Sequence, residues 1–143
     1  MIIRAFDLAD IESVIQLWDE CQLTRPQNDP RLDIMRKLTV QPELFLVGTV
    51  NGRVIASAMA GYEGHRGWVN YLAVGLLERG VGHGRRMMDE VERLLEERGC
   101  PKVNLQIRVG NEAAIGFYLS LGYVADNAVS FGKRIISDWP DPS

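Results

Sequence analysis

The sequence predicts an α/β fold of the α+β kind, in which a mixed, mostly antiparallel central sheet carries helices on both faces. Strand-like apolar runs alternate with amphipathic helical segments along the chain. Two of the apolar runs flank Asn51-Gly52, a dipeptide that favours the tight turn of an antiparallel hairpin. A glycine-rich turn at 79–84 then joins a strand to a helix. With 143 residues, 46% of them apolar, residues 1–143 are expected to form one domain.

The first third of the chain predicts one strand and two helices. Residues 2–6 form the strand, and Asp7 is placed to cap the helix that follows. The apolar residues of that helix share one face: Ile11, Val14, Ile15, Trp18 and Cys21. Asp29 is the expected N-cap of the second helix and Pro30 its first residue, and Pro42 ends the segment.

A meander of strands is expected next. Residues 44–50 and 54–61 pair around Asn51-Gly52, and residues 68–74 supply a third strand. Hairpin connections of this kind make the sheet antiparallel at this point.

The last part of the chain predicts a helix, a strand, a second helix and a second strand, in that order. A helix runs from Gly84 to Gly99, a strand covers 102–109, and Asn111 caps a final helix that Gly122 closes. Residues 129–136 are expected to form one more strand, whose exposed edge is a site at which two subunits of a homodimer would pair. Residues 138–143 are expected to fray.

The glycine-rich turn is the strongest chemical signal. Gly80, Gly82 and Gly84 alternate between the end of a strand and the start of a helix. Glycines let several backbone N–H groups approach one ligand, and a helix N-terminus adds unpaired donors and a positive dipole. This arrangement predicts an anion site that suits a pyrophosphate, and the neighbouring Arg79, Arg85 and Arg86 make it basic.

Composition excludes several classes of function. No apolar stretch approaches the length of a membrane span, and the first residues lack the features of a signal peptide, so a cytoplasmic protein without membrane contact is expected. A net charge of −3 without a basic run argues against general nucleic-acid binding. Two histidines and two scattered cysteines give no metal-ligand pattern, so no metal is expected. The turn fits neither a Rossmann fingerprint nor a P-loop, because it lacks their glycine spacing and the Lys-Ser/Thr ending.

Two motifs in fixed order resemble the GNAT family of N-acetyltransferases. The first is Arg79-Gly80-Val81-Gly82-His83-Gly84 after Leu72-Ala73-Val74. The second is Asn111-Glu112-Ala113-Ala114-Ile115-Gly116-Phe117-Tyr118, followed by Leu121-Gly122-Tyr123. The resemblance covers almost the whole chain. Segments 23–30, 61–67 and 98–102 make the sequence most similar to the YpeA-type bacterial acetyltransferases.

The resemblance implies a sheet that splays near its middle and an acetyl-CoA-dependent N-acetyltransferase. The strand ending at Val74 and the strand 102–109 would separate, and acetyl-CoA would lie between them. Backbone groups of Leu72 and Val74 would pair with the pantetheine arm, which is an extended, peptide-like chain. The resemblance further implies a set of residues at the cofactor's phosphates: Arg79, Gly80, Val81, Gly82, His83, Gly84 and Arg85, with Asn111 nearby.

The resemblance also implies direct transfer of acetyl to a primary amine, of a small molecule or of a peptide or protein N-terminus, in a ternary complex. Tyr118 would donate a proton to the departing sulfur. Some family members place a glutamate in a Leu-Glu-Val-Arg strand, whereas this chain has Gln106 in Leu105-Gln106-Ile107-Arg108. Because an amide cannot take a proton at neutral pH, Glu63 is the substitute base, directly or through water. Leu76 and His83 also depart from the family pattern without removing a backbone donor.

Each of these assignments has a structural alternative. By periodicity alone Tyr118 is equally a core aromatic, Asn111 a helix cap and Glu63 a turn residue beside Gly64. The competing function is a non-catalytic acyl-CoA-binding module or sensor, which would keep the glycine turn and lack a base. The absence of a carboxylate at Gln106 keeps that alternative open.

Overall fold

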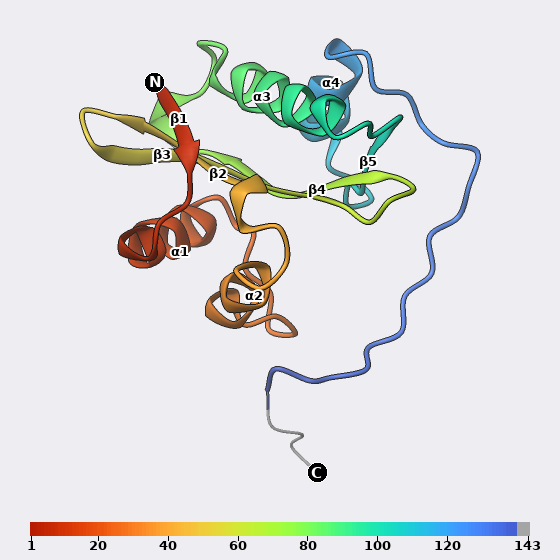
Figure 1. Ribbon diagram of the computed structural model, residues 1–143, viewed down its shortest axis with the longest axis horizontal. Coiled ribbons are helices and arrows are strands. Elements are labelled where there is room, and N and C mark those ends of the chain that lie inside the picture. Colours follow the sequence, from red (N-terminus) through yellow and green to blue (C-terminus); the bar gives the residue numbers. More distant parts are fainter. Residues whose placement is uncertain (140–143) are drawn as a thin grey trace.

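A five-stranded sheet in the order β1-β2-β3-β4-β5 forms the centre of the molecule in the computed structural model, which describes residues 1–139 (Figure 1). The strands are β1 Ile2–Ala5, β2 Phe45–Val50, β3 Arg53–Tyr62, β4 Gly67–Val74 and β5 Val103–Leu105. The first three neighbouring pairs are antiparallel and β4 pairs with β5 in parallel. The predicted mixed, mostly antiparallel fold class is therefore confirmed.

In the described residues, four α-helices cover the two faces of the sheet. They are α1 Ile11–Glu20, α2 Pro30–Lys37, α3 His83–Glu97 and α4 Glu112–Ser120. Figure 1 shows α1 and α2 below the sheet and α3 and α4 above it. Short 3₁₀ turns precede α1, β2 and α3 at Leu8–Asp10, Pro42–Leu44 and Leu76–Glu78.

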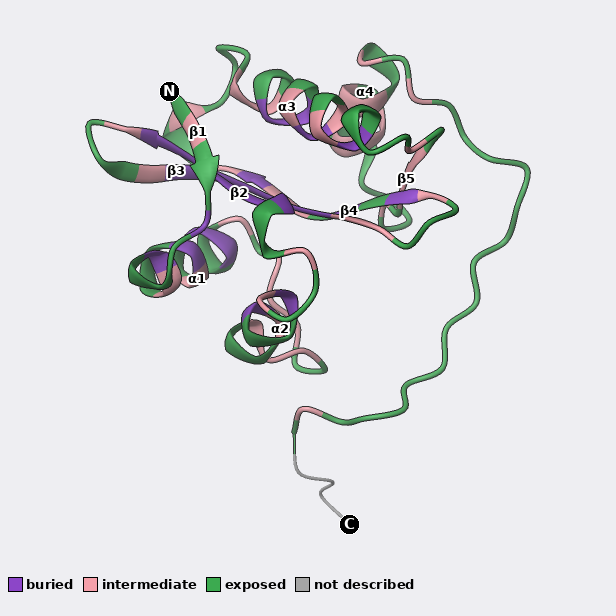
Figure 2. Ribbon diagram, in the orientation of Figure 1, coloured by how far each residue is buried: buried purple, intermediate pink, exposed green. Residues whose placement is uncertain are grey.

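Side-chain alternation along β2 divides the apolar interior into two cores. Leu46 and the preceding Leu44 belong to the core beneath α3, which includes Met87, Met88, Val91 and Leu95. Phe45 and Val47 belong to the core beneath α1 and α2. Because successive residues of a strand point to opposite faces, one strand supplies both cores, and Figure 2 shows the buried stripes on both sides of the sheet.

Local signals place the ends of several elements where the sequence predicts them. Asn51 and Gly52 both have positive φ, as a tight hairpin turn between β2 and β3 requires. Asp29 accepts hydrogen bonds from two N–H groups in the first turn of α2, and Asn111 accepts one from Ala114 N–H in α4. Asp7 caps the 3₁₀ turn before α1 rather than α1 itself.

The strand predicted over 102–109 is much shorter than expected. It pairs with β4 only through Val103–Leu105, and β4 continues beyond that pairing to Val74. The inner edge of β4 after Val69 therefore has no strand partner in the described part of the chain. The two strands separate at this point, in the place where the family resemblance implies a slot.

The strand predicted over 129–136 is wrong. These residues have no regular secondary structure, and Figure 1 shows the chain after α4 swinging away from the sheet in an extended path. Val129, Phe131 and Ile135 lie at alternate positions, as apolar residues of a strand do. A strand also needs the edge of another strand to pair with, and residues 129–136 pair with none in the described part of the chain.

The fraying predicted for residues 138–143 is not seen at Asp138. Its carboxylate accepts hydrogen bonds from Arg36 and from the Asp29 N–H group. Residues 140–143 lie outside the described part. Between residues 1 and 139, the structure contains no helix with the length and apolar character needed to cross a membrane.

Candidate functional site

A β-bulge in β4 turns its backbone toward the open side of the sheet. Met59 lies opposite Asn70 and Ser57 opposite Ala73, so β4 has one extra residue in this interval. Before the bulge, Gly67 N–H donates to Lys102 O at 2.8 Å, toward β5. After it, Gly75 N–H donates to Ile55 O at 2.8 Å, toward β3. Gly67 and Gly75 are eight positions apart, and in a regular strand their N–H groups would point to the same neighbouring strand. They point to opposite neighbours, so the bulge has reversed the direction of the backbone groups that follow it.

The reversal determines where Leu72 and Val74 point. The backbone N–H and C=O groups of successive residues in a strand point alternately to its two neighbours. Gly75 points to β3, so Val74 and Leu72 point away from β3. They therefore line the opening where β5 has diverged. Val74 O accepts hydrogen bonds there from Arg79 Nε, at 3.0 Å, and from Cys21 Sγ, at 3.4 Å.

Buried side chains hold the bulge in place. Tyr71 has a φ of 54°, a left-handed conformation that costs a residue with a side chain about 1–2 kcal/mol. Ser57 Oγ donates to Tyr71 O at 2.8 Å and accepts from Trp18 Nε1 at 2.8 Å. The Trp18 and Tyr71 rings stack at 3.8 Å, and the Tyr71 hydroxyl donates to Asp33 Oδ2 at 2.6 Å. Burial and this carboxylate raise the pKa of Tyr71 above its ordinary value.

The glycine-rich loop ends on an uncapped helix N-terminus. Gly80 and Gly82 have φ values of 84° and 91°, and no atom of residues 1–139 lies within 4 Å of a Cβ built on either one. Gly82 is the N-cap of α3, and no side chain in the described part of the chain caps the first turn. The first N–H groups of this 15-residue helix are therefore free for a ligand. His83 Nδ1 is buried without a hydrogen-bond partner in the described residues.

Gly84 has a different structural role from the one expected. It lies inside α3 without a positive φ, and a Cβ there would be 3.0 Å from Phe117 Cζ. The glycine lets α3 pack closely against α4. Gly80 and Gly82 thus supply the positive φ values of the loop, and Gly84 supplies close helix packing.

The arginines beside the loop are held by carbonyl oxygens. Arg79 bonds to Val74 O, and Arg85 Nη2 donates to Ser120 O at the C-terminus of α4, at 3.3 Å. These bonds hold two positively charged side chains that are close in sequence to the N-terminus of α3. Val81 and Arg86 are exposed.

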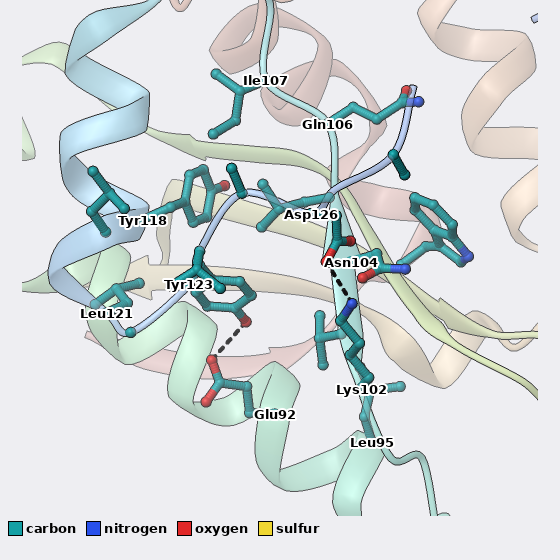
Figure 3. A pocket seen from close by; sticks show the side chains of 18 of the residues that line it. Glu92, Leu95, Lys102, Asn104, Gln106, Ile107, Tyr118, Leu121, Tyr123 and Asp126 are labelled. Carbon is teal, nitrogen blue, oxygen red and sulfur yellow. Dashed lines mark hydrogen bonds and ion pairs between the residues drawn. The ribbon is translucent and has the colours of Figure 1, made fainter. Parts of the chain in front are cut away.

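Tyr118 lies on α4 and points toward β5 beside Ile107 (Figure 3). Its ring meets Phe117 and Tyr123 edge-on, at 5.0 and 5.7 Å between centroids. Burial raises the pKa of Tyr118 to about 12. The neighbouring Tyr123 hydroxyl donates to Glu92 Oε2 at 2.7 Å, whereas Tyr118 has no such carboxylate partner among the described residues.

Glu63 lies in the turn between β3 and β4, at the end of the sheet where β4 and β5 are paired. Its Oε1 accepts from the N–H groups of His65 and Arg66, and these bonds lower its pKa below the ordinary value for a glutamate. A lower pKa makes the carboxylate a weaker base. Gln106 donates to Ser130 Oγ, and Asn111 acts as the cap of α4.

Comparison with known proteins agrees with this geometry. The sequence model of the Acetyltransferase (GNAT) family matches residues 11–123. The chain belongs to the GNAT family. It is 48% identical over 138 residues to an acetyltransferase of Yersinia pestis strain Pestoides F, a match that covers 96% of this chain and 98% of the relative. The YpeA-type likeness stays a prediction.

Solved structures share the GNAT fold. Ard1 from Thermoplasma volcanium is 30% identical, with a TM-score of 0.76 and coverage of 86% of this chain and 82% of that one. AAC(6')-Iy in complex with the bisubstrate analogue CoA-S-monomethyl-acetylneamine also has a TM-score of 0.76, at 16% identity, covering 94% of this chain and 98% of that one.

The sequence did not indicate the residues that hold the β4 bulge next to the candidate site. Trp18 was expected only as an apolar helix residue, and Ser57 and Tyr71 carried no expectation. A buried serine in the middle of an apolar strand was the one signal of this support, because a buried hydroxyl needs partners.

Proposed function

We propose that this GNAT chain transfers an acetyl group from acetyl-CoA to a primary amine by direct attack in a ternary complex. One juxtaposition carries the proposal: the N-terminus of α3, with its Arg79–Gly84 loop, follows closely after the edge of β4 that has no strand partner among residues 1–139. A phosphate site and a strand edge in line match a ligand with a diphosphate at one end and an extended amide chain beyond it.

The loop fits the diphosphate of a coenzyme A. Backbone N–H groups from Arg79 to Gly84 would hold the phosphate oxygens, since Gly80 and Gly82 leave open space above the backbone. The partnerless His83 Nδ1 marks a polar group at the same place that the described residues do not satisfy. Asn111, at the start of α4, is a further proposed contact.

The edge of β4 fits the pantetheine arm. Its amide groups require donors and acceptors spaced as in a strand, and Leu72 and Val74 direct their backbone groups to the open side. The Leu72 N–H is our candidate for the donor that polarises the thioester carbonyl.

Acetyl-CoA supplies the acetyl group as a thioester, so a C–N bond forms, a C–S bond breaks and the sulfur leaves as a thiolate. Tyr118 would stabilise that thiolate. With a pKa of about 12 its phenol is a weaker acid than a thiol of pKa about 8.5, so a hydrogen bond to the sulfur is favoured over complete proton transfer. This refines the role expected from the sequence.

The acceptor must lose a proton before it attacks, because an alkylammonium has a pKa of about 10. Glu63 is our candidate for the base, at the end of a water relay. Its two backbone hydrogen bonds keep it ionised, although they also weaken it as a base.

The choice of a primary amine is supported by the relatives. AAC(6')-Iy forms a complex with the bisubstrate analogue CoA-S-monomethyl-acetylneamine, and Naa20 from Chaetomium thermophilum forms a complex with a bisubstrate analogue. For this chain we propose only the class of acceptor, a primary amine of a small molecule or of a peptide N-terminus. The cytoplasmic location also stays a prediction.

The test is release of free coenzyme A thiol from acetyl-CoA with polyamines, amino acids, aminoglycosides and peptides with free N-termini. Turnover with one class supports the proposal and identifies the acceptor. The alternative is a non-catalytic acyl-CoA sensor, favoured by the engagement of both Glu63 and Gln106 in other hydrogen bonds. Acetyl-CoA binding by calorimetry without turnover on any acceptor would support the sensor, and no binding would exclude both.

A further inference from the structure

The peptide group between Tyr71 and Leu72 carries the donor proposed above for the thioester carbonyl. A peptide group is planar and trans, so its C=O and its N–H point in opposite directions. The Tyr71 C=O accepts a hydrogen bond from Ser57 Oγ, on β3, at 2.8 Å. The Leu72 N–H is therefore directed away from β3, to the open side of β4. The contacts that hold Tyr71 in place also set the direction of this donor.

Three contacts hold Tyr71 in its unusual conformation. Its φ of 54° is a strained backbone conformation, which persists only where the surroundings enforce it. Ser57 holds the carbonyl, and the Trp18 ring stacks on the Tyr71 ring at 3.8 Å between centroids. Stacked rings tolerate a range of offsets, so stacking sets the plane of the ring but not its position in that plane. The third contact acts at the far end of the ring, where the hydroxyl donates to Asp33 Oδ2 at 2.6 Å.

Asp33 differs from the other two contacts in its place in the fold. It lies on α2 outside the buried core, and its side chain is 21% exposed. Asp29 caps the start of α2, and the Asp29 carbonyl accepts from the Asp33 N–H at 3.0 Å. The next residue, Ile34, is fully buried in the core beneath α1 and α2. The cap and this buried anchor place the Asp33 carboxylate at the Tyr71 hydroxyl.

The Asp33 carboxylate is itself held in one orientation. Its other oxygen, Oδ1, accepts from Arg36 Nη1 at 3.2 Å. The two oxygens thus have different partners, and rotation of the carboxylate would break both bonds. Burial and the Asp33 carboxylate raise the pKa of Tyr71 above its ordinary value, so the phenol remains protonated and continues to donate.

We propose that Asp33 is a positioning residue for acetyl transfer, which fixes the direction of the Leu72 N–H through the Tyr71 hydroxyl. This role rests on the proposed function, because it takes the Leu72 N–H as the donor to the thioester carbonyl. A donor that is aligned before the reaction stabilises the developing negative charge without reorganisation. Without Asp33 the ring end is released and the Tyr71-Leu72 peptide gains freedom to rotate. The carbonyl is then less polarised, while the phosphate loop still holds the coenzyme.

The test is the ¹³C NMR signal of acetyl-CoA labelled at the acetyl carbonyl, free and bound in the absence of an acceptor. A hydrogen bond to a carbonyl moves its ¹³C signal downfield. We expect the parent to produce this shift, and Asp33→Ala and Tyr71→Phe each to lose most of it, while calorimetry shows similar coenzyme affinities. The double variant should lose no more than either single variant, because both changes break the same bond. If Asp33→Ala does not fold, Tyr71→Phe provides the same comparison.

Asp33→Asn distinguishes positioning from a role of the negative charge. Asparagine retains an oxygen that accepts from the Tyr71 hydroxyl, so this variant should restore most of the shift. Glu92→Ala is the matched control, because Glu92 accepts from the Tyr123 hydroxyl at 2.7 Å. It breaks a tyrosine–carboxylate bond of the same kind on α3, and the carbonyl shift should remain that of the parent.

The outcomes separate this role from the proposed function. A parent that does not bind acetyl-CoA would overturn both. Binding by the parent without a carbonyl shift, or a full shift in Asp33→Ala or in Tyr71→Phe, would overturn the role of Asp33 alone. The same holds if Asp33→Asn loses as much of the shift as Asp33→Ala, or if Glu92→Ala loses as much as either.

Discussion

Ser57 and Tyr71 are joined by a hydrogen bond that controls the direction of the β4 edge. Ser57 Oγ donates to the Tyr71 carbonyl at 2.8 Å and is itself fully buried. The bond holds the bulge whose extra residue directs Leu72 and Val74 to the open side of the sheet. A side chain on β3 thereby fixes the edge of β4 that we propose as the site of the pantetheine arm.

Ser57→Ala should therefore weaken both folding and acetyl-CoA binding. The substitution leaves Trp18 Nε1–H and Tyr71 O without their buried partner, at a cost of about 1–3 kcal/mol in the free energy of unfolding. We expect denaturant unfolding to show this loss and calorimetry to show weaker binding. Ser13→Ala, at an exposed position of α1, is the control and should change neither. Unaltered coenzyme affinity in a folded Ser57→Ala protein would contradict the supporting role.

Gly82→Ala tests the phosphate loop. Adding a Cβ at positive φ costs about 1 kcal/mol of stability, and the methyl group would project into the space proposed for the diphosphate. We expect acetyl-CoA affinity to fall about tenfold or more. Gly99→Ala is a matched control, because Gly99 also has a positive φ and open surroundings but follows the opposite end of α3. Both variants should lose similar stability, and equal coenzyme affinities would refute the loop's role.

Tyr118→Phe should lower kcat by about 100-fold while leaving acetyl-CoA affinity near that of the parent, because only the hydrogen bond to the leaving sulfur is removed. Steady-state kinetics and calorimetry measure the two effects. Tyr123→Phe removes the neighbouring hydroxyl, which bonds to Glu92, and should lower stability without a comparable loss of kcat. Equal kinetic losses in the two variants would assign Tyr118 to packing.

The pH dependence follows from the groups that must change protonation. Only the neutral amine reacts, so kcat/KM should rise about tenfold per pH unit toward the amine pKa of about 10. Tyr118 must stay protonated, and its pKa of about 12 means that its contribution is lost only as the pH rises through that value. Assays with buffers of constant ionic strength should therefore show no descending limb between about pH 7 and pH 10. A descending limb near pH 8 would contradict this assignment.

Glu63→Gln distinguishes a role of Glu63 as the catalytic base from a role in holding the turn between β3 and β4. Glutamine keeps an oxygen that accepts from His65 and Arg66 N–H, so the melting temperature should change little. If the carboxylate takes the amine proton through water, kcat should fall about 100-fold. A kcat within a few-fold of the parent, at an unchanged melting temperature, would leave Glu63 with the turn role alone.

Much of the fold and the outline of the site could be read from local signals. Asp29 and Asn111 cap helices, and Asn51-Gly52 turns a hairpin, because each of these residues acts on backbone groups only a few positions away. The loop at Gly80 and Gly82 was equally visible, since glycine is the residue that adopts positive φ without strain. The sequence alone thus determined the order of the elements from β1 to α4 and the place of the loop that we propose as the anion site.

Only the tertiary structure decided which backbone groups and which edges are free. The bulge at Tyr71 depends on Ser57 and Trp18, and Gly84 is required by Phe117 on another helix. The end of β5 at Leu105 and the extended path of residues 129–136 depend on which edges come together in space. Contacts between residues distant in the chain leave no periodic pattern in either partner, so the sequence specified the alternating apolar residues of 129–136 but not that this segment would lie away from any strand edge.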